Sequence, residues 1–296
     1  MAGRSPHSRL WLVGSLLLVT MLVSCRVEPD ASVGQSEEEG AAERYSTDRL
    51  VSDTLRAMSY NIAAGRGDLE AVRREIKAAD PDLVALQEVD IHWGERSDWA
   101  DQASELARAL GMERVFGEIY RFPGATADDP DRRYGLAILS RWPVVEEVNH
   151  TLTRIATQGE DPTPMPMPGF PEAVIDWNGR TIRFFSTHLD YRPDPSVRRQ
   201  QVAETLEILD RGSEPIILAG DLNARPESPE LRPLFESLQD VWTETAGPGT
   251  TFPADNPDRR IDYILYRGPW QVVHAEVPET TASDHRPVVA DMVWRP

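Results

Sequence analysis

Short, mostly apolar segments with a polar residue at or next to one end recur along this chain and limit the folds open to it. The segments span residues 55–62, 82–89, 181–189, 215–222, 260–266 and 286–294. Apolar runs of this length, bounded by polar residues, are typical of strands that are buried in a sheet. We therefore expect the polar residues to gather at one rim of the sheets, where ligand sites of such folds tend to lie.

Three helices are predicted between these strands. Asp68 is a typical N-cap for a helix over residues 69–80, whose apolar side chains recur at helical spacing. Gly111 is suited to end a second helix, over residues 103–111. The longest predicted helix covers residues 196–212. Helices thus alternate with strands over much of the chain, whereas strands dominate its C-terminal part.

Further strands and one loop complete the pattern. The strands are predicted at residues 134–140, 144–150, 172–177 and 270–277. Residues 161–171, DPTPMPMPGFP, contain too many prolines for a helix or a strand, so we expect a long loop there. Together these elements predict a mixed sheet system with helices on the outside.

The polar residues at the strand ends are of the types that metal-assisted attack at phosphorus needs. Glu88 offers a hard oxygen ligand of the kind that Mg²⁺ prefers. Asp221 can orient or deprotonate an attacking water. His188 and His285, when protonated, can donate to the phosphate oxygens on which charge develops in the transition state.

Three further residues can support this chemistry. Asp262 can hold the His285 imidazolium in orientation and raise its pKa through the nearby opposite charge. Asn61 and Asn223 offer neutral amide donors. Taken singly, Asn61 and Asn223 are also compatible with plain turns, and Asp262 with the start of a strand. The joint occurrence of two histidines and several carboxylates at strand ends favours catalysis.

Seven segments, taken in order, resemble the successive motifs of the endonuclease/exonuclease/phosphatase superfamily. They are SYNIAAG, ALQEVD, YGLAILSR, STHLD, GDLNARP, RRIDYIL and SDHRPV. That superfamily includes deoxyribonucleases, abasic-site endonucleases, inositol-polyphosphate phosphatases and bacterial sphingomyelinases. The resemblance extends from about residue 55 to the end of the chain. It implies an α/β fold, a four-layer sandwich of two mixed β-sheets packed face to face with helices on the outside.

The resemblance also implies a role for each residue in the motifs. Glu88 would be the metal ligand, with Asn61 and Asp284 beside it. A divalent ion, Mg²⁺ or Mn²⁺, is the cofactor that the resemblance implies. Some members carry a second acidic residue where this chain has Ala63, which favours one tightly held ion over two.

The remaining implied roles concern the water and the phosphate. Asp221 would activate the attacking water, and Asn223 would donate to the phosphate. His188 and His285 would be the catalytic histidines, with Asp262 as the partner of His285. Tyr134 would place a hydroxyl on the phosphate side of the site.

The N-terminus has the features of an export signal. Basic residues precede an apolar stretch that ends in LVSC, which resembles the lipobox of bacterial lipoproteins. We therefore predict a signal peptide over residues 1–24 and lipidation of Cys25, the only cysteine of the chain. An ordinary secretory signal with an incidental cysteine is the alternative.

The predicted domain order follows from this N-terminus. An acidic tether over residues 25–53 is too poor in apolar residues to fold, and one domain covers residues 54–296. The expected location is the cell envelope, outside the cytoplasm, with the protein anchored to a membrane through its lipid.

The charge balance bears on the partner. A formal net charge of −18 disfavours duplex nucleic acid, because phosphate backbones are bound through lysine and arginine. Arg198 and Arg199 are expected on a solvated helix face. A phospholipid head group, an inositol phosphate or a nucleotide-like diester fits a lipoprotein better, and we expect a monomer. A binding or scaffolding lipoprotein with an inactive site on the same fold is the alternative function.

Overall fold

In the computed structural model, which describes residues 53–65, 68–159, 161–244 and 247–296, the strands pair into two six-stranded sheets. The first sheet contains, in spatial order, β11 (Trp270–Glu276), β12 (Val288–Trp294), β1 (Thr54–Asn61), β2 (Leu83–Ile91), β4 (Arg132–Ser140) and β3 (Glu113–Phe122). The second contains β5 (Val144–Arg154), β6 (Met165–Trp177), β7 (Arg180–His188), β8 (Ile216–Asp221), β10 (Asp262–Arg267) and β9 (Gln239–Asp240). Each sheet is mixed, because β1 and β2 are parallel and β7 and β8 are parallel among antiparallel neighbours.

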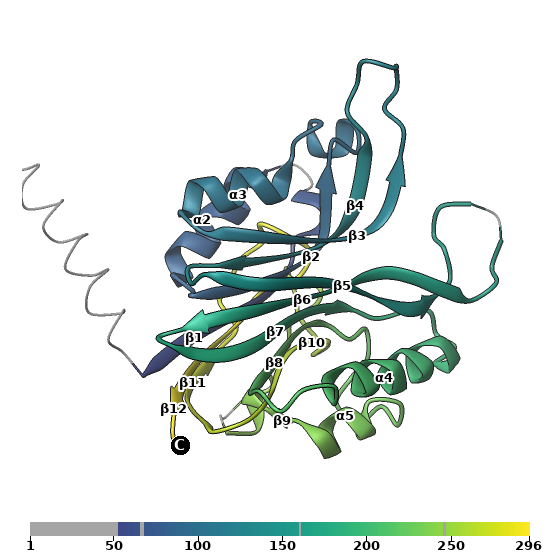
Figure 1. The fold of residues 1–296 in the computed structure, drawn as a ribbon. Helices are drawn as coiled ribbons and strands as arrows, with labels where there is room; N and C mark the ends of the chain where they lie inside the picture. Colours follow the sequence, from purple (N-terminus) through teal and green to yellow (C-terminus); the bar gives the residue numbers. More distant parts are fainter. Residues whose placement is uncertain (1–52, 66–67, 160, 245–246) are drawn as a thin grey trace, which may run out of the picture. The chain divides into compact units, whose positions relative to one another are not determined.

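Helices cover the outer face of each sheet (Figure 1). The helices α2 (Leu69–Ala79) and α3 (Gln102–Leu110) pack on the first sheet, and α4 (Ser196–Leu209) and α5 (Arg232–Ser237) pack on the second. Short 3₁₀ turns lie at Ala63–Gly65, Glu95–Ser97 and Val241–Glu244. Asp68 caps α2 by accepting a hydrogen bond from the Ala71 amide at 2.8 Å, as predicted.

Alternation along the strands builds three hydrophobic layers. Side chains of successive strand residues point to opposite faces of a sheet. Phe184 therefore belongs to the core between the two sheets, whereas Phe185 packs in the layer beneath α4. Ala57 and Met58 divide in the same way between the central core and the layer beneath α2. The predicted four-layer sandwich with outer helices is confirmed.

The strand β6 begins inside the segment that was expected to be a loop, so that prediction is wrong from Met165 onward. This part of β6 pairs only with β5, because β7 pairs with later residues of β6. Pro166 and Pro168 alternate along it, and a bulge at Gly169, where φ is 111°, restores the phase for Pro171. The prolines can thus place their missing N–H groups on the unpaired side.

Two other features differ from the expectations. The strand β3 was not predicted, because its apolar residues alternate with charged ones along an edge strand that buries a single face. Arg198 was expected on a solvated helix face, but it is buried and forms an ion pair with Glu230 at 2.7 Å.

The predictions for the N-terminus fall on residues that the structure does not describe. The signal peptide, Cys25 and the tether as far as residue 52 lie in this part of the chain. Among the residues that are described, no helix has both the length and the apolar character needed to cross a membrane.

Candidate active site

Three neighbouring strands of the second sheet place catalytic residue types side by side. His188 ends β7 and pairs in register with Asp221, the last residue of the parallel strand β8. Asp221 pairs in turn with Asp262, the first residue of the antiparallel strand β10. Because lateral partners in a sheet lie about 5 Å apart, the ladder itself brings these three side chains together.

The first sheet contributes an amide and a carboxylate to the same rim. Asn61 ends β1, and its amide nitrogen donates to both Glu88 Oε1 and Asp221 Oδ2, each at 3.2 Å. The amide oxygen of Asn61 accepts from the backbone N–H of Ala63 at 3.1 Å, which fixes the orientation of the amide group. Asn61 thus links the carboxylates of the two sheets.

Glu88 lies at an irregularity in β2. The pairing of β2 with β4 shifts register between Leu86 and Val89, and Glu88 has a φ of 57°, in the left-handed region. A bulge of this kind redirects a side chain, and bulges are common beside active sites. Gln87, the preceding residue, is fully buried and donates to the Ser186 hydroxyl of the facing sheet at 3.1 Å.

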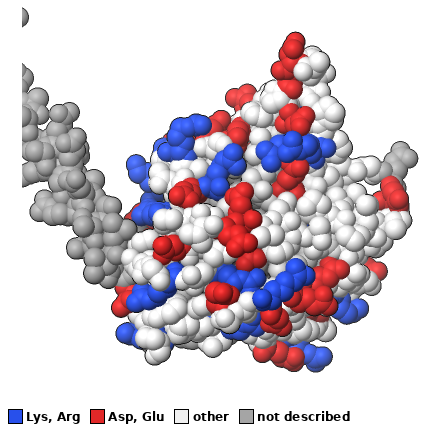
Figure 2. Space-filling model, viewed as in Figure 1, with Lys and Arg blue, Asp and Glu red and all other residues white. Residues whose placement is uncertain are grey.

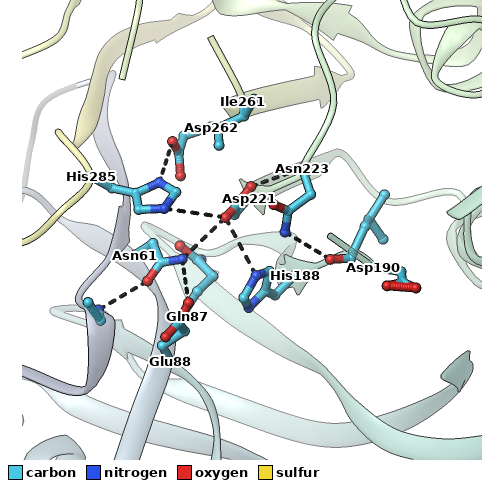
Figure 3. Close-up of polar contacts among 12 residues, drawn as sticks. Asn61, Gln87, Glu88, His188, Asp190, Asp221, Asn223, Ile261, Asp262 and His285 are labelled. Carbon is cyan, nitrogen blue, oxygen red and sulfur yellow. Dashed lines mark hydrogen bonds and ion pairs between the residues drawn. The ribbon is translucent and has the colours of Figure 1, made fainter. Parts of the chain in front are cut away.

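His285 lies between two carboxylates, as Figure 3 shows. Its Nδ1 is 2.9 Å from Asp262 Oδ2, and its Nε2 is 3.8 Å from Asp221 Oδ2. His188 approaches Asp221 from another side, with Nε2 at 3.5 Å from the same Oδ2. Asp221 Oδ2 is therefore approached by two imidazoles and by the Asn61 amide.

The environment shifts the pKa values of Asp221 and His285 upward. Burial and the neighbouring negative charge of Asp262 raise the pKa of Asp221 to about 6, although the two histidines act in the opposite direction. Burial alone would lower the pKa of His285, but the charge of Asp262 and its hydrogen bond outweigh burial and raise that pKa to about 10. At neutral pH His285 is protonated, and Asp221 is mostly ionised.

Asn223 is held beside Asp221 by a tight turn. Its φ is 51°, and its backbone N–H donates to Asp221 Oδ1 at 2.8 Å. Its side-chain amide donates to the Leu189 carbonyl at 3.0 Å, next to the end of β7. This network leaves each Asp221 oxygen with at least one hydrogen bond.

A cleft of about 380 Å³ opens at this rim. The predicted site residues that line it are Glu88, Tyr134, His188, Asp221, Asn223, Asp284 and His285. Asn61 and Asp262 lie behind this lining, each hydrogen-bonded to residues that form it. The structure therefore brings together all of the residues that the sequence placed at strand ends.

Tyr134 and Asp284 lie at the edges of the cleft. Burial raises the pKa of the Tyr134 phenol, so this hydroxyl remains a proton donor at any working pH. Tyr134 stacks on Tyr120, with ring centroids 6.1 Å apart, and Trp93 packs against it at 5.6 Å. Asp284 is exposed, and its carboxylate accepts from the Ser283 hydroxyl at 3.3 Å.

Two sets of residues have the chemistry to hold a divalent metal. Glu88, Asp221 and Asp284 present carboxylates to one cleft, and carboxylate oxygens are the ligands that Mg²⁺ prefers. Asp221, Asp262 and His285 also offer ligand atoms within 4.8 Å of one another. In this second set Nδ1 of His285 is already hydrogen-bonded to Asp262 at 2.9 Å. The Glu88 set offers carboxylates alone, the donor type that Mg²⁺ prefers, whereas among the described residues the second set is the one whose ligand atoms lie this close together.

Several cleft residues carried no signal in the sequence. Arg154, Tyr120, Trp93 and Arg96 also line the cleft. They lie in edge strands and loops without a short motif, so only the fold brings them to the site. The charged group of Arg96 lies over the rings of Trp93 and Tyr134, at 5.4 and 5.5 Å from their centroids.

Comparison with known proteins places this geometry in context. The model of the endonuclease/exonuclease/phosphatase family matches residues 58–285, which include every candidate site residue. A crystal structure of an endonuclease/exonuclease/phosphatase from Beutenbergia cavernae DSM 12333 has a TM-score of 0.65 and 25% identity, covering 82% of this chain and 72% of that chain.

Two relatives are similar over most of their length. The uncharacterised protein YbhP of Escherichia coli (strain K12) is 24% identical over 264 residues, covering 83% of this chain and 98% of YbhP. Sphingomyelinase C of Bacillus cereus is 24% identical over 275 residues, covering 76% of this chain and 79% of that protein.

Proposed function

The chain belongs to the endonuclease/exonuclease/phosphatase family, whose members are divalent-metal-dependent hydrolases of phosphoesters, and we propose that it hydrolyses a phosphoester bond with water activated by Asp221. The observation that carries the proposal is the environment of Asp221. This carboxylate is buried at the cleft, contacted by two histidines, and has a pKa of about 6. A general base is most effective when its pKa lies near the working pH.

His285 supplies positive charge beside this base, and His188 offers a second imidazole nitrogen 3.5 Å from the same carboxylate oxygen. His285 is protonated at neutral pH, its Nδ1 donates to Asp262, and its Nε2 faces the cleft beside Asp221. From there it can donate to an oxygen of the phosphoryl group as negative charge develops. A donor that is held in place before the reaction costs no reorganisation at the transition state. Asn223, which lies beside Asp221, can donate to the same group.

Glu88 is the proposed metal ligand, and Asp284 lines the same cleft. Asn61 holds Glu88 and Asp221 in a fixed relation by donating to both. A bound Mg²⁺ or Mn²⁺ would polarise the phosphoryl oxygens and stabilise the leaving oxygen. Ala63 contributes no carboxylate, which supports a single ion. Asp221 and His285 would transfer the protons, and Asn61 and Asn223 would position the reacting groups.

The proposed substrates are small or lipid-linked phosphoesters rather than duplex nucleic acid. Lysine and arginine are interspersed with aspartate and glutamate over the described part of the face in Figure 2, and this face has no continuous basic surface. The net charge of −18 points the same way. The similarity to sphingomyelinase C supports a lipid-linked substrate, and the lipobox-like LVSC segment supports a membrane-tethered enzyme.

An inactive scaffold on the same fold is the alternative, and the intact site argues against it. A turnover screen decides between the two. The full chain, purified in detergent, is assayed on p-nitrophenyl phosphate and bis-p-nitrophenyl phosphate with Mg²⁺ or Mn²⁺, beside Asp221→Asn. Metal-dependent turnover that is lost in the variant supports the proposal. Equal, background-level release by both proteins on these and on phospholipid and inositol phosphate substrates would support the scaffold.

A further inference from the structure

Three arginines of the described chain are buried, and they differ in how their charge is balanced. Arg154, Arg183 and Arg198 are each at most 9% exposed. Arg183 pairs with Glu172 at 2.5 Å, and Arg198 pairs with Glu230 at 2.7 Å. Burial of a charge is costly unless an opposite charge compensates for it. Arg154 has no carboxylate within ion-pair distance among the described residues.

The contacts of Arg154 hold its guanidinium in place without neutralising it. Its two terminal nitrogens donate to the backbone carbonyls of His188 at 3.0 Å and Gly169 at 2.9 Å. Its Nε is buried and has no hydrogen-bond partner among the described residues. Burial lowers the pKa of Arg154 to about 10, so the group remains charged at neutral pH.

The carboxylates nearest to Arg154 are engaged elsewhere. Asp190 forms an ion pair with Arg192 at 2.8 Å. Glu204 accepts hydrogen bonds at 2.6 Å from both the backbone and the hydroxyl of Thr153. The positive charge of Arg154 is therefore left without an ion-pair partner in the part of the chain that the structure describes.

Arg154 lines the cleft to one side of the hydrolytic residues. The ionisable groups that act on it most strongly are Tyr120, Tyr134, Asp190 and Glu204, rather than Glu88, Asp221 or His285. The Tyr134 hydroxyl, which borders the same part of the cleft, has no hydrogen-bond partner among the described residues. A buried cation and a hydroxyl without a described hydrogen-bond partner thus line the same cleft as the hydrolytic residues.

Building on the proposed function, we infer that the cleft contains a second anion-binding subsite formed by Arg154 and Tyr134. The substrate class is then a phosphoester that carries a further anionic group, such as a second phosphate, besides the one that is attacked. An unpaired guanidinium in a dry setting binds a phosphate more strongly than it does in water. A head group with a cation next to its phosphate would instead place a like charge beside Arg154.

The test compares a monophosphate with bisphosphates of similar chain length. Isothermal titration calorimetry with the full chain in detergent and Mg²⁺ measures the Kd of propyl phosphate and of bisphosphates of ethane-, propane- and butanediol. At least one bisphosphate should bind about tenfold more tightly than propyl phosphate, or better, as expected for a charged hydrogen bond. In Arg154→Gln this advantage should fall to about twofold, whereas the Kd of propyl phosphate should change little.

Matched variants separate the possible outcomes. Arg154→Lys keeps the charge without the planar fork and should retain part of the advantage, and Arg132→Gln, which removes a cation outside this cleft, should retain all of it. No advantage of any bisphosphate in the wild-type protein would overturn the inference, and this result does not depend on whether a variant folds. An equal loss for both ligand types in Arg154→Gln would also overturn it, because Arg154 would then act at the attacked phosphate. If the bisphosphates show no advantage but the protein still hydrolyses p-nitrophenyl esters, the second subsite is refuted and the proposed hydrolase activity is not. If the protein hydrolyses no ester, the proposed function itself is refuted.

Discussion

His285 and Asp262 form a buried pair in which Nδ1 of the imidazole lies 2.9 Å from a carboxylate oxygen of Asp262. The His285 side chain is 7% exposed and that of Asp262 is fully buried. A buried carboxylate at this distance keeps the imidazole charged well above neutral pH. The pair therefore sets the upper end of the pH range in which the proposed mechanism can operate.

We expect the pH dependence of kcat to be bell-shaped. Activity should fall as the pH decreases through about 6, because protonation of Asp221 removes the base, and as the pH increases through about 10, because His285 loses its proton. Asp262→Asn should move the alkaline limb to lower pH, since the charge that raises the pKa of His285 is lost. Profiles of both proteins on one substrate measure this, and an alkaline limb that Asp262→Asn leaves in place would contradict the assignment to His285.

Metal removal should abolish turnover. EDTA should reduce kcat to background, and Mg²⁺ or Mn²⁺ should restore it. Glu88→Gln should raise the metal concentration needed for half-maximal activity by about tenfold or more, because it removes a charged oxygen ligand. Circular dichroism should show an intact fold. Full activity after EDTA treatment would exclude the proposed role of the metal.

Arg198→Met should destabilise the fold by about 3–5 kcal/mol, because it leaves Glu230 buried without its partner. The double variant Arg198→Met with Glu230→Gln should recover much of this loss, since no uncompensated charge remains. Urea denaturation of the three proteins measures the free energies of unfolding. Similar stability of the wild type and the single variant would show that the pair contributes little.

The lipid anchor is tested by Cys25→Ser. We expect the wild-type protein in the membrane fraction and the variant in an unprocessed or soluble form, because the lipidated cysteine is the predicted attachment point. Fractionation and mass spectrometry of the N-terminus measure this. A wild-type protein that extracts without detergent and carries no lipid mass would refute the lipoprotein prediction.

Residues at the ends of strands could be predicted because their pattern is local. Asp221 and His188 each follow a short apolar run, and parallel pairing of β7 and β8 places them side by side. The approach of His285 to Asp262 was also foreseen, from residue type. The raised pKa of Asp221 was not, because it depends on burial and on the charges of other strands.

Features that depend on the tertiary fold could not be predicted from the sequence. In the sequence, the prolines of β6 indicate a loop. The strand pairing shows that alternate residues can direct the missing N–H groups to the side of β6 that is not hydrogen-bonded to β5. Arg154 lies in no short motif, and its isolation from any carboxylate appears only once the sheets and helices are packed. Arg198 likewise has the neighbours in sequence that are typical of a surface residue, but in the fold it is buried in an ion pair with Glu230.

The central claim is that Asp221 activates the attacking water, and kcat of Asp221→Asn tests it most directly. Asparagine preserves the shape of the side chain and can accept a hydrogen bond, but it cannot take up a proton. At pH 8 with saturating metal, we expect kcat to fall by about a thousandfold or more, in line with the loss of a general base. The melting temperature should not fall, because burial already disfavours the ionised carboxylate. A kcat within about tenfold of the wild-type value would contradict the account, because general-base catalysis contributes more than that.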